Sequence, residues 1–414
     1  MTAPVRDPLL AFRFPEFRYY VAANFLFTCA FLIQEVVIGF ELYKITNDPL
    51  AIGLVGLSYA LPFMGLSLVG GHLADRLSKK KILLISLTGM TACSALLSYF
   101  AAQLADTPGE RSLQFIIYGL IAVTGGCYAF YSPTASSLKP MLVPRHAYEN
   151  AATWGSAGWQ AGTIVGPALS GFIYAWTDFS TTIQVVVGLQ VVVFLLITLI
   201  GDRKILQQES GNLIVKIKQG IAFVFQKKML LYSISLDLFA VLFGGVVAIL
   251  PVFAKDILGV GAEGLGILRA APSVGAMLTL LTLSFFSLLK NAWRTLLLNV
   301  AAFGVATLVF AVSENFWLSV VALFFTGAFD AVSVVIRQTI LQLLVPDEMR
   351  GRVGAVNGIF LSASNELGAF ESGLAASLMG AVPSVIFGGV MALGIVGWVW
   401  MKSKHLFGVD LREE

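Results

Sequence analysis

Apolar stretches of about 20 residues follow one another along almost the whole chain, and they constrain its fold more than any other feature. About 20 apolar residues in a helix are needed to cross the ~30 Å hydrocarbon core of a bilayer. Only 12% of the 414 residues are charged, whereas 57% are hydrophobic. A water-soluble chain of this length needs more charge to cover its surface. We therefore predict an all-α membrane protein that crosses the bilayer many times.

Charged, glycine and proline residues divide the chain into twelve predicted membrane helices. They lie near residues 17–43, 50–74, 81–105, 112–138, 151–176, 180–201, 229–254, 263–289, 295–313, 316–344, 352–379 and 384–401. Cytoplasmic loops keep an excess of Lys and Arg. Of the 27 Lys and Arg residues, only Lys44, Arg111 and Lys255 lie on loops that follow odd-numbered helices, and Arg269 and Arg337 lie within helices. The other 22 lie at the termini and on the loops that follow even-numbered helices. We therefore expect both termini on the cytoplasmic side of the cell's inner (plasma) membrane.

The two halves of the chain carry the same pattern of glycine and proline residues. At an offset of 202 the repeated residues are Leu142-Val143-Pro144 with Leu344-Val345-Pro346, Gly166 with Gly368 and Gly171 with Gly373; at an offset of 210 they are Gly56, Pro62 and Gly65 with Gly266, Pro272 and Gly275. We predict a six-helix bundle at 1–202, a cytoplasmic linker with an amphipathic segment at 203–228, and a second six-helix bundle at 229–414. Repeated bundles of this kind form a substrate pathway at their interface, so the pattern favours transport.

The loop between the second and third helices carries a recognisable motif. The run from Gly71 to Lys80, Gly-His-Leu-Ala-Asp-Arg-Leu-Ser-Lys-Lys, resembles the loop 2-3 signature of the major facilitator superfamily, with Ser78 in a glycine position. The resemblance extends from the first helix to the twelfth, and it implies two pseudo-symmetric bundles that expose a site alternately to the two sides. It also implies a gating role for Asp75, together with Gly71, Arg76 and Lys80. The alternative is that the basic residues only anchor the loop to the inner leaflet.

The fifth helix carries a second motif. Its run from Gly162 to Gly171 resembles the antiporter signature of the same superfamily through Gly162, Gly166, Pro167 and Gly171, which implies export. The alternative is a packing stripe, because small residues at four-residue spacing let another helix approach closely. The segment 132–144, with Pro346 to Arg352, is similar to the drug:proton antiporter branch that includes the enterobactin exporter. Helix 112–138 lacks the arginine of many proton-coupled relatives, which argues against coupling by that route.

Several charged residues lie inside predicted helices, where a charge at the bilayer centre costs about 2.5–3.5 kcal/mol and usually lines a cavity or has a partner. The candidates for proton or substrate binding are Glu35, Asp237, Asp330, Arg337 and Glu366. Asp330 and Arg337 are seven residues apart on one helix face, and Glu366 lies at a comparable depth on the next helix. We expect one polar cluster. Either one of the candidate acids exchanges protons with the bulk phases, or Asp330, Arg337 and Glu366 neutralise one another and brace the second half.

No motif for a cofactor, a metal or nucleotide hydrolysis has the context that it needs. The run Gly259-Val260-Gly261-Ala262-Glu263-Gly264 has dinucleotide-binding spacing, but it joins two membrane helices and follows no strand, so it is interpreted as a turn. We expect no enzyme, no cofactor and no nucleic-acid partner.

The leading interpretation is a monomeric secondary exporter, surrounded by membrane lipids, that exchanges protons for a small amphiphilic compound such as a drug-like molecule or a siderophore. The first alternative is a flippase of lysophospholipids or other lipids. The second is a membrane receptor that transports nothing. Compound sensitivity of a deletion strain separates the exporter from the flippase, because loss of a flippase alters lipid remodelling instead of drug tolerance.

Glu35 is an acidic residue inside the first predicted membrane helix, which makes it a candidate for the proton or substrate site. We predict that Glu35→Gln abolishes export or uncouples it from the proton gradient, because the amide cannot bind and release a proton. Proton-driven efflux is to be measured in membrane vesicles. Unchanged efflux would remove Glu35 from the candidates.

Overall fold

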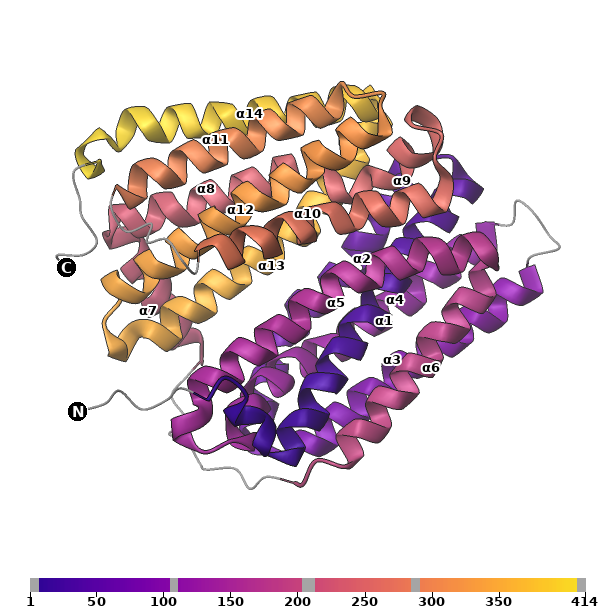
Figure 1. The fold of residues 1–414 in the computed structure, drawn as a ribbon, viewed down its shortest axis with the longest axis horizontal. Helices are drawn as coiled ribbons and strands as arrows, with labels where there is room; N and C mark the ends of the chain where they lie inside the picture. Colours follow the sequence, from indigo (N-terminus) through magenta and orange to yellow (C-terminus); the bar gives the residue numbers. More distant parts are fainter. Residues whose placement is uncertain (1–6, 105–110, 203–212, 284–290, 408–414) are drawn as a thin grey trace. The chain divides into compact units, whose positions relative to one another are not determined.

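The computed structural model describes residues 7–104, 111–202, 213–283 and 291–407, and long helices make up most of these ranges (Figure 1). The helices group into two compact units. Unit 1 comprises Met1–Glu41 and Ser58–Gln208, and unit 2 comprises Leu42–Leu57 and Glu209–Glu414. The all-α membrane fold expected from hydropathy is therefore what the described residues adopt.

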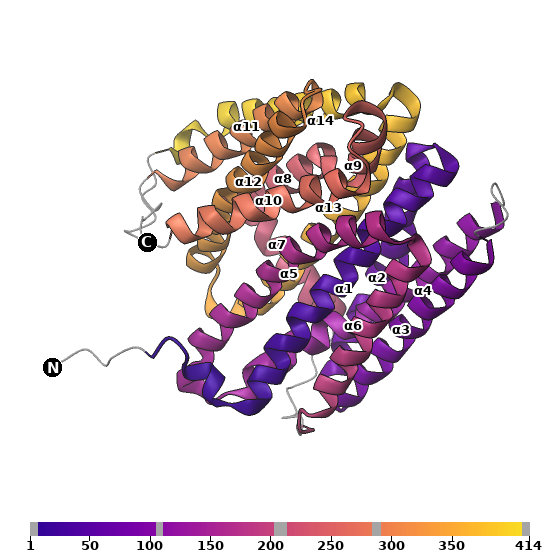
Figure 2. The same cartoon turned by 45° about the vertical axis from the view of Figure 1, so that its right-hand side comes forward.

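Unit 1 holds most of six long helices, although the end of α1 and the start of α2 belong to unit 2. They are α1 (Pro15–Thr46), α2 (Pro49–Arg76), α3 (Lys79–Leu104), α4 (Arg111–Leu138), α5 (Tyr148–Trp176) and α6 (Phe179–Thr198), with the short turns η1 (Leu10–Arg13), η2 (Lys139–Leu142) and η3 (Arg145–Ala147). Helix α3 packs against both α4 and α6, and α3 and α6 run alongside each other in Figures 1 and 2. The buried core includes Phe17, Leu87, Met90 and Ile197.

Unit 2 holds the second set of helices. They are α7 (Leu213–Gln226), α8 (Lys228–Gly244), α10 (Gly261–Leu283), α11 (Ala292–Ala311), α12 (Phe316–Leu344), α13 (Asp347–Met379) and α14 (Ala381–Lys402), with the short pieces η4 (Val246–Ile249), α9 (Leu250–Val252), η5 (Phe253–Ile257) and η6 (Lys404–Leu406). Helix α12 packs against α10 and α11, and α14 packs against α8 and α11. Trp293 lies buried in the core, where its indole N–H donates a hydrogen bond to the Ser403 hydroxyl at 2.8 Å.

Ten helices of the described part are long and apolar enough to cross a membrane. Helices α5 and α13 complete the predicted twelve, although only Leu367–Met379 of α13 is strongly apolar. Glycine, serine and other polar residues lower the hydropathy of both helices. They are the fifth and eleventh helices in the predicted order and correspond at the 202-residue offset. Each half therefore has its less apolar helix at the equivalent position.

The sequence repeat is also a repeat of packing contacts. In unit 1, Gly125 of α4 lies against the backbone of α2 at Tyr59, so closely that a Cβ at this glycine would collide with the Tyr59 carbonyl. In unit 2, Gly327 of α12 lies in the same way against the backbone of α10 at Pro272. The two glycines are 202 residues apart. Each unit therefore brings its second and fourth helices together through a glycine at the equivalent position.

The seventh predicted helix, 229–254, is wrong as a single continuous helix. The span Lys228–Ile257 is long and apolar, as expected, but α8 ends at Gly244 and short 3₁₀, α and π turns follow. A Gly-Gly pair, Gly244-Gly245, stands at the break, and Pro251 follows it. Glycine pairs and prolines are common causes of helix breaks and kinks, so the local sequence explains the interruption.

Two side chains from neighbouring helices bind carbonyl groups that the break exposes. The hydroxyl of Ser372, on α13, donates a hydrogen bond to the Gly245 carbonyl at 3.1 Å. The Arg269 guanidinium, on α10, donates one to the Val247 carbonyl at 2.8 Å. An unsatisfied backbone group in hydrocarbon costs several kcal/mol. Arg269, a charged residue within a membrane helix, therefore has a structural role at the break.

The segment Leu42–Leu57 is packed within unit 2, although it belongs to the first half of the sequence. The Tyr43 hydroxyl donates a hydrogen bond to the Asp256 carboxylate. The Lys255 ammonium donates one to the Asn47 side-chain oxygen at 2.9 Å, and it lies 5.0 Å from the centre of the Tyr43 ring. The helix ends around the first predicted outer loop are thus tied to the end of the seventh span by polar contacts.

We predict that Arg269→Met lowers the thermal stability of the purified protein, because the Val247 carbonyl loses the donor that the Arg269 guanidinium provides. A hydrogen bond between membrane helices is worth about 1 kcal/mol, so a decrease of about 1–2 °C in the unfolding temperature is expected. The measurement is thermal unfolding in detergent. Arg294→Met is the matched control, because the Arg294 side chain is exposed at the start of α11. Equal effects of the two substitutions would contradict the role given to Arg269.

Candidate functional site

Three charged side chains of unit 2 meet between α8 and α12. The Arg337 guanidinium forms an ion pair with the Asp237 carboxylate through Nη1, across the two helices. Its Nη2 lies 3.6 Å from Oδ1 of Asp330, which is two turns earlier on α12. Its Nε donates a hydrogen bond to the Ser333 carbonyl at 3.3 Å. We call Asp237, Asp330 and Arg337 the charge cluster.

The two carboxylates of the charge cluster differ in their surroundings. The side chain of Asp237 is 10% exposed and that of Arg337 is 11% exposed, whereas the side chain of Asp330 is 47% exposed. Buried charges are tolerated when a partner of opposite sign compensates them. Arg337 compensates Asp237 at close range and Asp330 at a longer distance. One cation against two acids leaves one negative charge when all three are ionised, and Asp330 is the less compensated acid.

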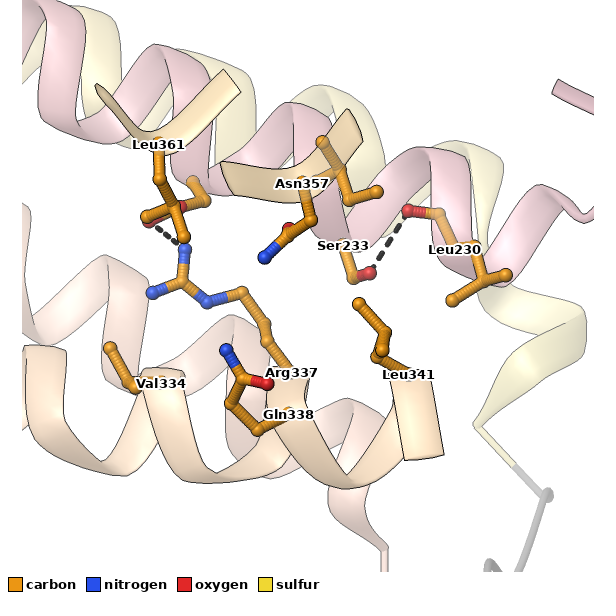
Figure 3. Close-up of a pocket in the computed structure, with 10 residues that line it drawn as sticks. Leu230, Ser233, Val334, Arg337, Gln338, Leu341, Asn357 and Leu361 are labelled. Atoms are coloured by element: carbon orange, nitrogen blue, oxygen red, sulfur yellow. Dashed lines mark hydrogen bonds and ion pairs between the residues drawn. The ribbon is translucent and has the colours of Figure 1, made fainter. Parts of the chain in front are cut away.

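Two small cavities adjoin the charge cluster. One has a volume of about 30 Å³, and its polar lining comes from Ser233, Asp237, Arg337, Gln338 and Asn357 (Figure 3). The other has a volume of about 10 Å³ and is lined by both aspartates, with Ser333 and apolar side chains. Volumes of this size are those that single water molecules occupy, so both cavities are too small for a drug-sized molecule.

Polar side chains from three helices surround the larger cavity. Figure 3 shows Arg337 and Gln338 on α12 and Asn357 on α13, with the two amide groups directed into the space beside the guanidinium. Ser233, on α8, donates its hydroxyl hydrogen bond to the Leu230 carbonyl at 3.0 Å. Sequence reasoning missed Gln338 and Asn357 because it drew its site candidates from the charged residues. Uncharged polar residues inside apolar helices are the signal that could have found them.

The structure places the other acidic candidates as follows. The Glu366 side chain, expected to join Asp330 and Arg337, lies outside the described residues, and the described partner of Arg337 across the helices is Asp237. Glu35 lies on α1 in unit 1 with an exposed side chain, and so is not part of the charge cluster of unit 2.

Basic residues of the loop 2-3 motif bind the carbonyl ends of nearby helices. The Lys79 ammonium donates to the Ala74 carbonyl in the last turns of α2 at 2.7 Å, and the Lys80 ammonium donates to the Thr198 carbonyl at the end of α6 at 2.6 Å. Cations are stabilised at helix C-termini, where carbonyl groups lack partners. Arg76 is exposed, and the Asp75 side chain lies outside the described residues. These bonds connect the loop to α2 and α6.

The glycine stripe of α5 is a close contact with α1. A Cβ on Gly162 would lie 2.7 Å from the Thr28 Cβ, and one on Gly166 would lie 3.1 Å from the Cys29 Cα. Both glycines, with Pro167 and Gly171, are buried. The packing role that sequence left as an alternative is therefore present in unit 1.

The equivalent helix of unit 2 makes the equivalent contact. Gly368 of α13 lies against α8, where a Cβ would come 3.2 Å from the Leu242 Cα. Gly373, further along α13, approaches Gly53 so closely that a Cβ on Gly373 would lie 2.7 Å from the Gly53 Cα. The first and fifth helices of each half thus pack through a glycine at one repeated position, Gly166 in unit 1 and Gly368 in unit 2.

Unit 1 contains an aromatic cluster formed by α1, α2 and α4. Its members are Phe27, Phe31, Tyr59, Phe63, Tyr128 and Tyr131. The rings of Phe27 and Tyr131 are 4.3 Å apart, and Tyr128 lies 5.4 Å from Phe31 and 5.6 Å from Phe63. Phe27 and Tyr131 are buried, whereas Phe63 and Tyr128 are partly exposed. The cluster therefore has a buried base and an accessible edge.

Comparisons with known proteins agree with this architecture. The family model described as Major Facilitator Superfamily matches residues 20–369. Macrolide efflux protein A of Streptococcus pyogenes is 22% identical over 359 residues, which are 84% of this chain and 86% of that protein. The enterobactin exporter EntS of Salmonella typhimurium is 23% identical and covers 92% of this chain and 90% of its own. The multidrug efflux pump Tap of Mycolicibacterium fortuitum is 25% identical, with coverage of 79% and 81%.

Solved structures of transporters share the fold. The nucleoside transporter NupG superposes with a TM-score of 0.68 at 16% identity, covering 95% of this chain and 99% of its own. A bacterial homologue of the human lysosomal transporter Spinster superposes with a TM-score of 0.67 at 15% identity, covering 96% and 97%. At such identities the likeness shows the architecture alone.

The glycine contact between α5 and α1 predicts that an added methyl group lowers the unfolding temperature at Gly162 but does not lower it at Gly119. Gly162→Ala should lower the unfolding temperature, because the added methyl group collides with Thr28. Gly119→Ala on α4 is the control, because nothing lies within 4 Å of its Cβ position. Alanine favours a helix by about 1 kcal/mol over glycine, so the control should be neutral or stabilising. Thermal unfolding in detergent measures both, and equal shifts would rule out the tight contact.

Proposed function

This chain belongs to the Major Facilitator Superfamily, and from this premise we propose that it exports small amphiphilic compounds from the cell in exchange for protons. The family assignment makes it a multi-pass membrane transporter rather than an enzyme. Transporters built from two bundles expose their substrate site to the two sides of the membrane alternately.

The similar proteins favour export. Three of them are named for macrolide efflux, multidrug efflux and enterobactin export, and each aligns with at least 79% of this chain. The cargo of this chain is accordingly proposed to be a drug-like molecule or a siderophore. The accessible edge of the aromatic cluster, at Phe63 and Tyr128, offers rings on which an aromatic or planar cargo can stack.

The charge cluster is the observation that supports proton coupling. With Asp237 compensated by Arg337, a proton on Asp330 makes the cluster neutral, and its release restores one negative charge. Charged residues inside membrane helices commonly mark proton relays. The adjoining cavities have room for water molecules that could carry the proton. We therefore assign proton exchange to Asp330, and to the Asp237–Arg337 pair the role of holding α8 against α12.

Moving a proton down the membrane potential supplies energy for export. One elementary charge crossing 100 mV is worth about 2.3 kcal/mol, which corresponds to a concentration ratio of about fiftyfold for a neutral cargo. A single exchanging carboxylate is therefore sufficient for useful accumulation.

Other predictions from the sequence remain predictions. They include the gating role of Asp75, the roles of Glu35 and Glu366, a monomeric state and a cytoplasmic location of both termini. The division into bundles at 1–202 and 229–414, with a linker at 203–228, also remains a prediction.

The proposed coupling is tested with purified protein in liposomes that carry an imposed pH gradient. We expect Asp330→Asn to abolish uphill transport of a macrolide, a catecholate siderophore or a lipophilic cation, because an amide cannot release a proton. Exchange of labelled for unlabelled cargo at equal pH should persist, since it needs no net proton movement. A pH-sensitive dye inside the liposomes reports the accompanying proton flux.

Glu314→Gln is the matched control, because Glu314 is an exposed acid between α11 and α12. It should leave both transport and proton flux unchanged. Proton-coupled accumulation by Asp330→Asn at the level of the unsubstituted protein would refute the assignment. A lysophospholipid in the same panel tests the flippase alternative, since its movement between leaflets without transport of the other compounds would replace export as the function.

A further inference from the structure

The short helix α7 is held near the membrane surface by the chain itself. It ends at Gln226, and the apolar span Lys228–Ile257 begins only two residues later. The helix cannot move further from the headgroups than this connection permits. Its sequence from Leu213 to Gln226 contains two lysines and no acidic residue.

One face of α7 packs against the first part of α13. A Cβ on Gly220 would lie 2.7 Å from the Arg352 carbonyl oxygen and 2.9 Å from the Val356 Cγ2. Val224, one turn later on the same face, is 3% exposed and belongs to the core of unit 2. The orientation of α7 about its own axis is therefore set by this contact.

The opposite face of α7 presents apolar side chains beside a lysine. Ile221 is 37% exposed and Phe225, one turn later, is 64% exposed. Lys218 is exposed and lies three residues before Ile221, so the three side chains are neighbours on the helix surface. Two further exposed lysines, Lys227 and Lys228, follow at the end of the helix. A helix that is already packed on one side thus keeps a second apolar stripe, bordered by positive charge.

We propose that this face of α7 binds the anionic lipid surface of the cytoplasmic leaflet. Ile221 and Phe225 insert among the upper acyl chains, and Lys218, Lys227 and Lys228 contact lipid phosphates. A basic helix with exposed aromatic and aliphatic side chains fits the boundary between headgroups and acyl chains, and negative lipids attract its lysines. A lipid surface is favoured over a protein partner because the adjoining span already places α7 within reach of the headgroups.

The inference goes beyond the transport chemistry and is independent of which cargo is moved. It depends on the expected cytoplasmic position of the linker. Because α7 also packs on α13, a lipid-bound α7 would fix one end of the helix that carries Asn357 of the larger cavity.

The test places an environment-sensitive fluorophore on the proposed lipid face. A bimane label is attached to the F225C variant, in a background with the three native cysteines replaced, in nanodiscs of phosphatidylcholine with or without phosphatidylglycerol. We expect blue-shifted emission, strong quenching by lipids that carry a shallow nitroxide, and little quenching by aqueous iodide. Q219C is the matched control, because Gln219 is exposed on the same helix outside the Ile221–Phe225 stripe, and iodide should quench it well.

A second measurement uses the unsubstituted protein, so that a poorly folded variant cannot decide the outcome. Hydrogen exchange of the segment 218–226 should be slower in nanodiscs with phosphatidylglycerol than in pure phosphatidylcholine. The difference should shrink when Lys218 and Lys227 are both replaced by Gln. Equal iodide quenching of the F225C and Q219C labels, a label at F225C shielded from both lipid and iodide, or exchange that is insensitive to anionic lipid would each overturn the proposal.

Discussion

The need to satisfy every backbone hydrogen bond within hydrocarbon is the constraint on which the rest of this structure depends. It explains why the described residues form helices over nearly their whole length. It also explains what happens where a helix fails, at Gly244-Gly245, because side chains from two other helices then bind the exposed carbonyls. Arg269, a charged residue within a predicted membrane helix, supplies one of these donors.

The same constraint applies to charged side chains, and unit 2 meets it in two ways. Arg269 is committed to a carbonyl group, whereas Arg337 is shared between two carboxylates at different distances. Sharing leaves Asp330 only partly compensated, which is a poor arrangement for stability alone, since one cation and one acid would neutralise each other fully. The proposed proton exchange at Asp330 rests on this uneven sharing.

Glycine determines how closely the helices approach. Lipid tails are as apolar as the helix surfaces, so van der Waals contact and interhelical hydrogen bonds drive packing inside a membrane more than the hydrophobic effect does. The contacts of Gly162 and Gly166 with α1, and of Gly368 with α8, are of this kind and recur in both halves. The motif in α5 is thus a packing device in its own right, and the assignment of export draws its support from the similar proteins.

The sequence by itself determined most of the helices, their order, the repeat and the membrane environment, because hydropathy and helix-breaking residues act over one or two turns. The spacing of Asp330 and Arg337 placed both on one face of a helix. Only the tertiary structure decided that Asp237, a hundred residues earlier in the chain, is the close partner of Arg337, and that Gln338 and Asn357 border the same cavity. The physical reason is that spacing along a helix defines a face but not the neighbour that the face meets. That choice depends on the rotation of each helix about its axis, which the packing of the whole bundle sets.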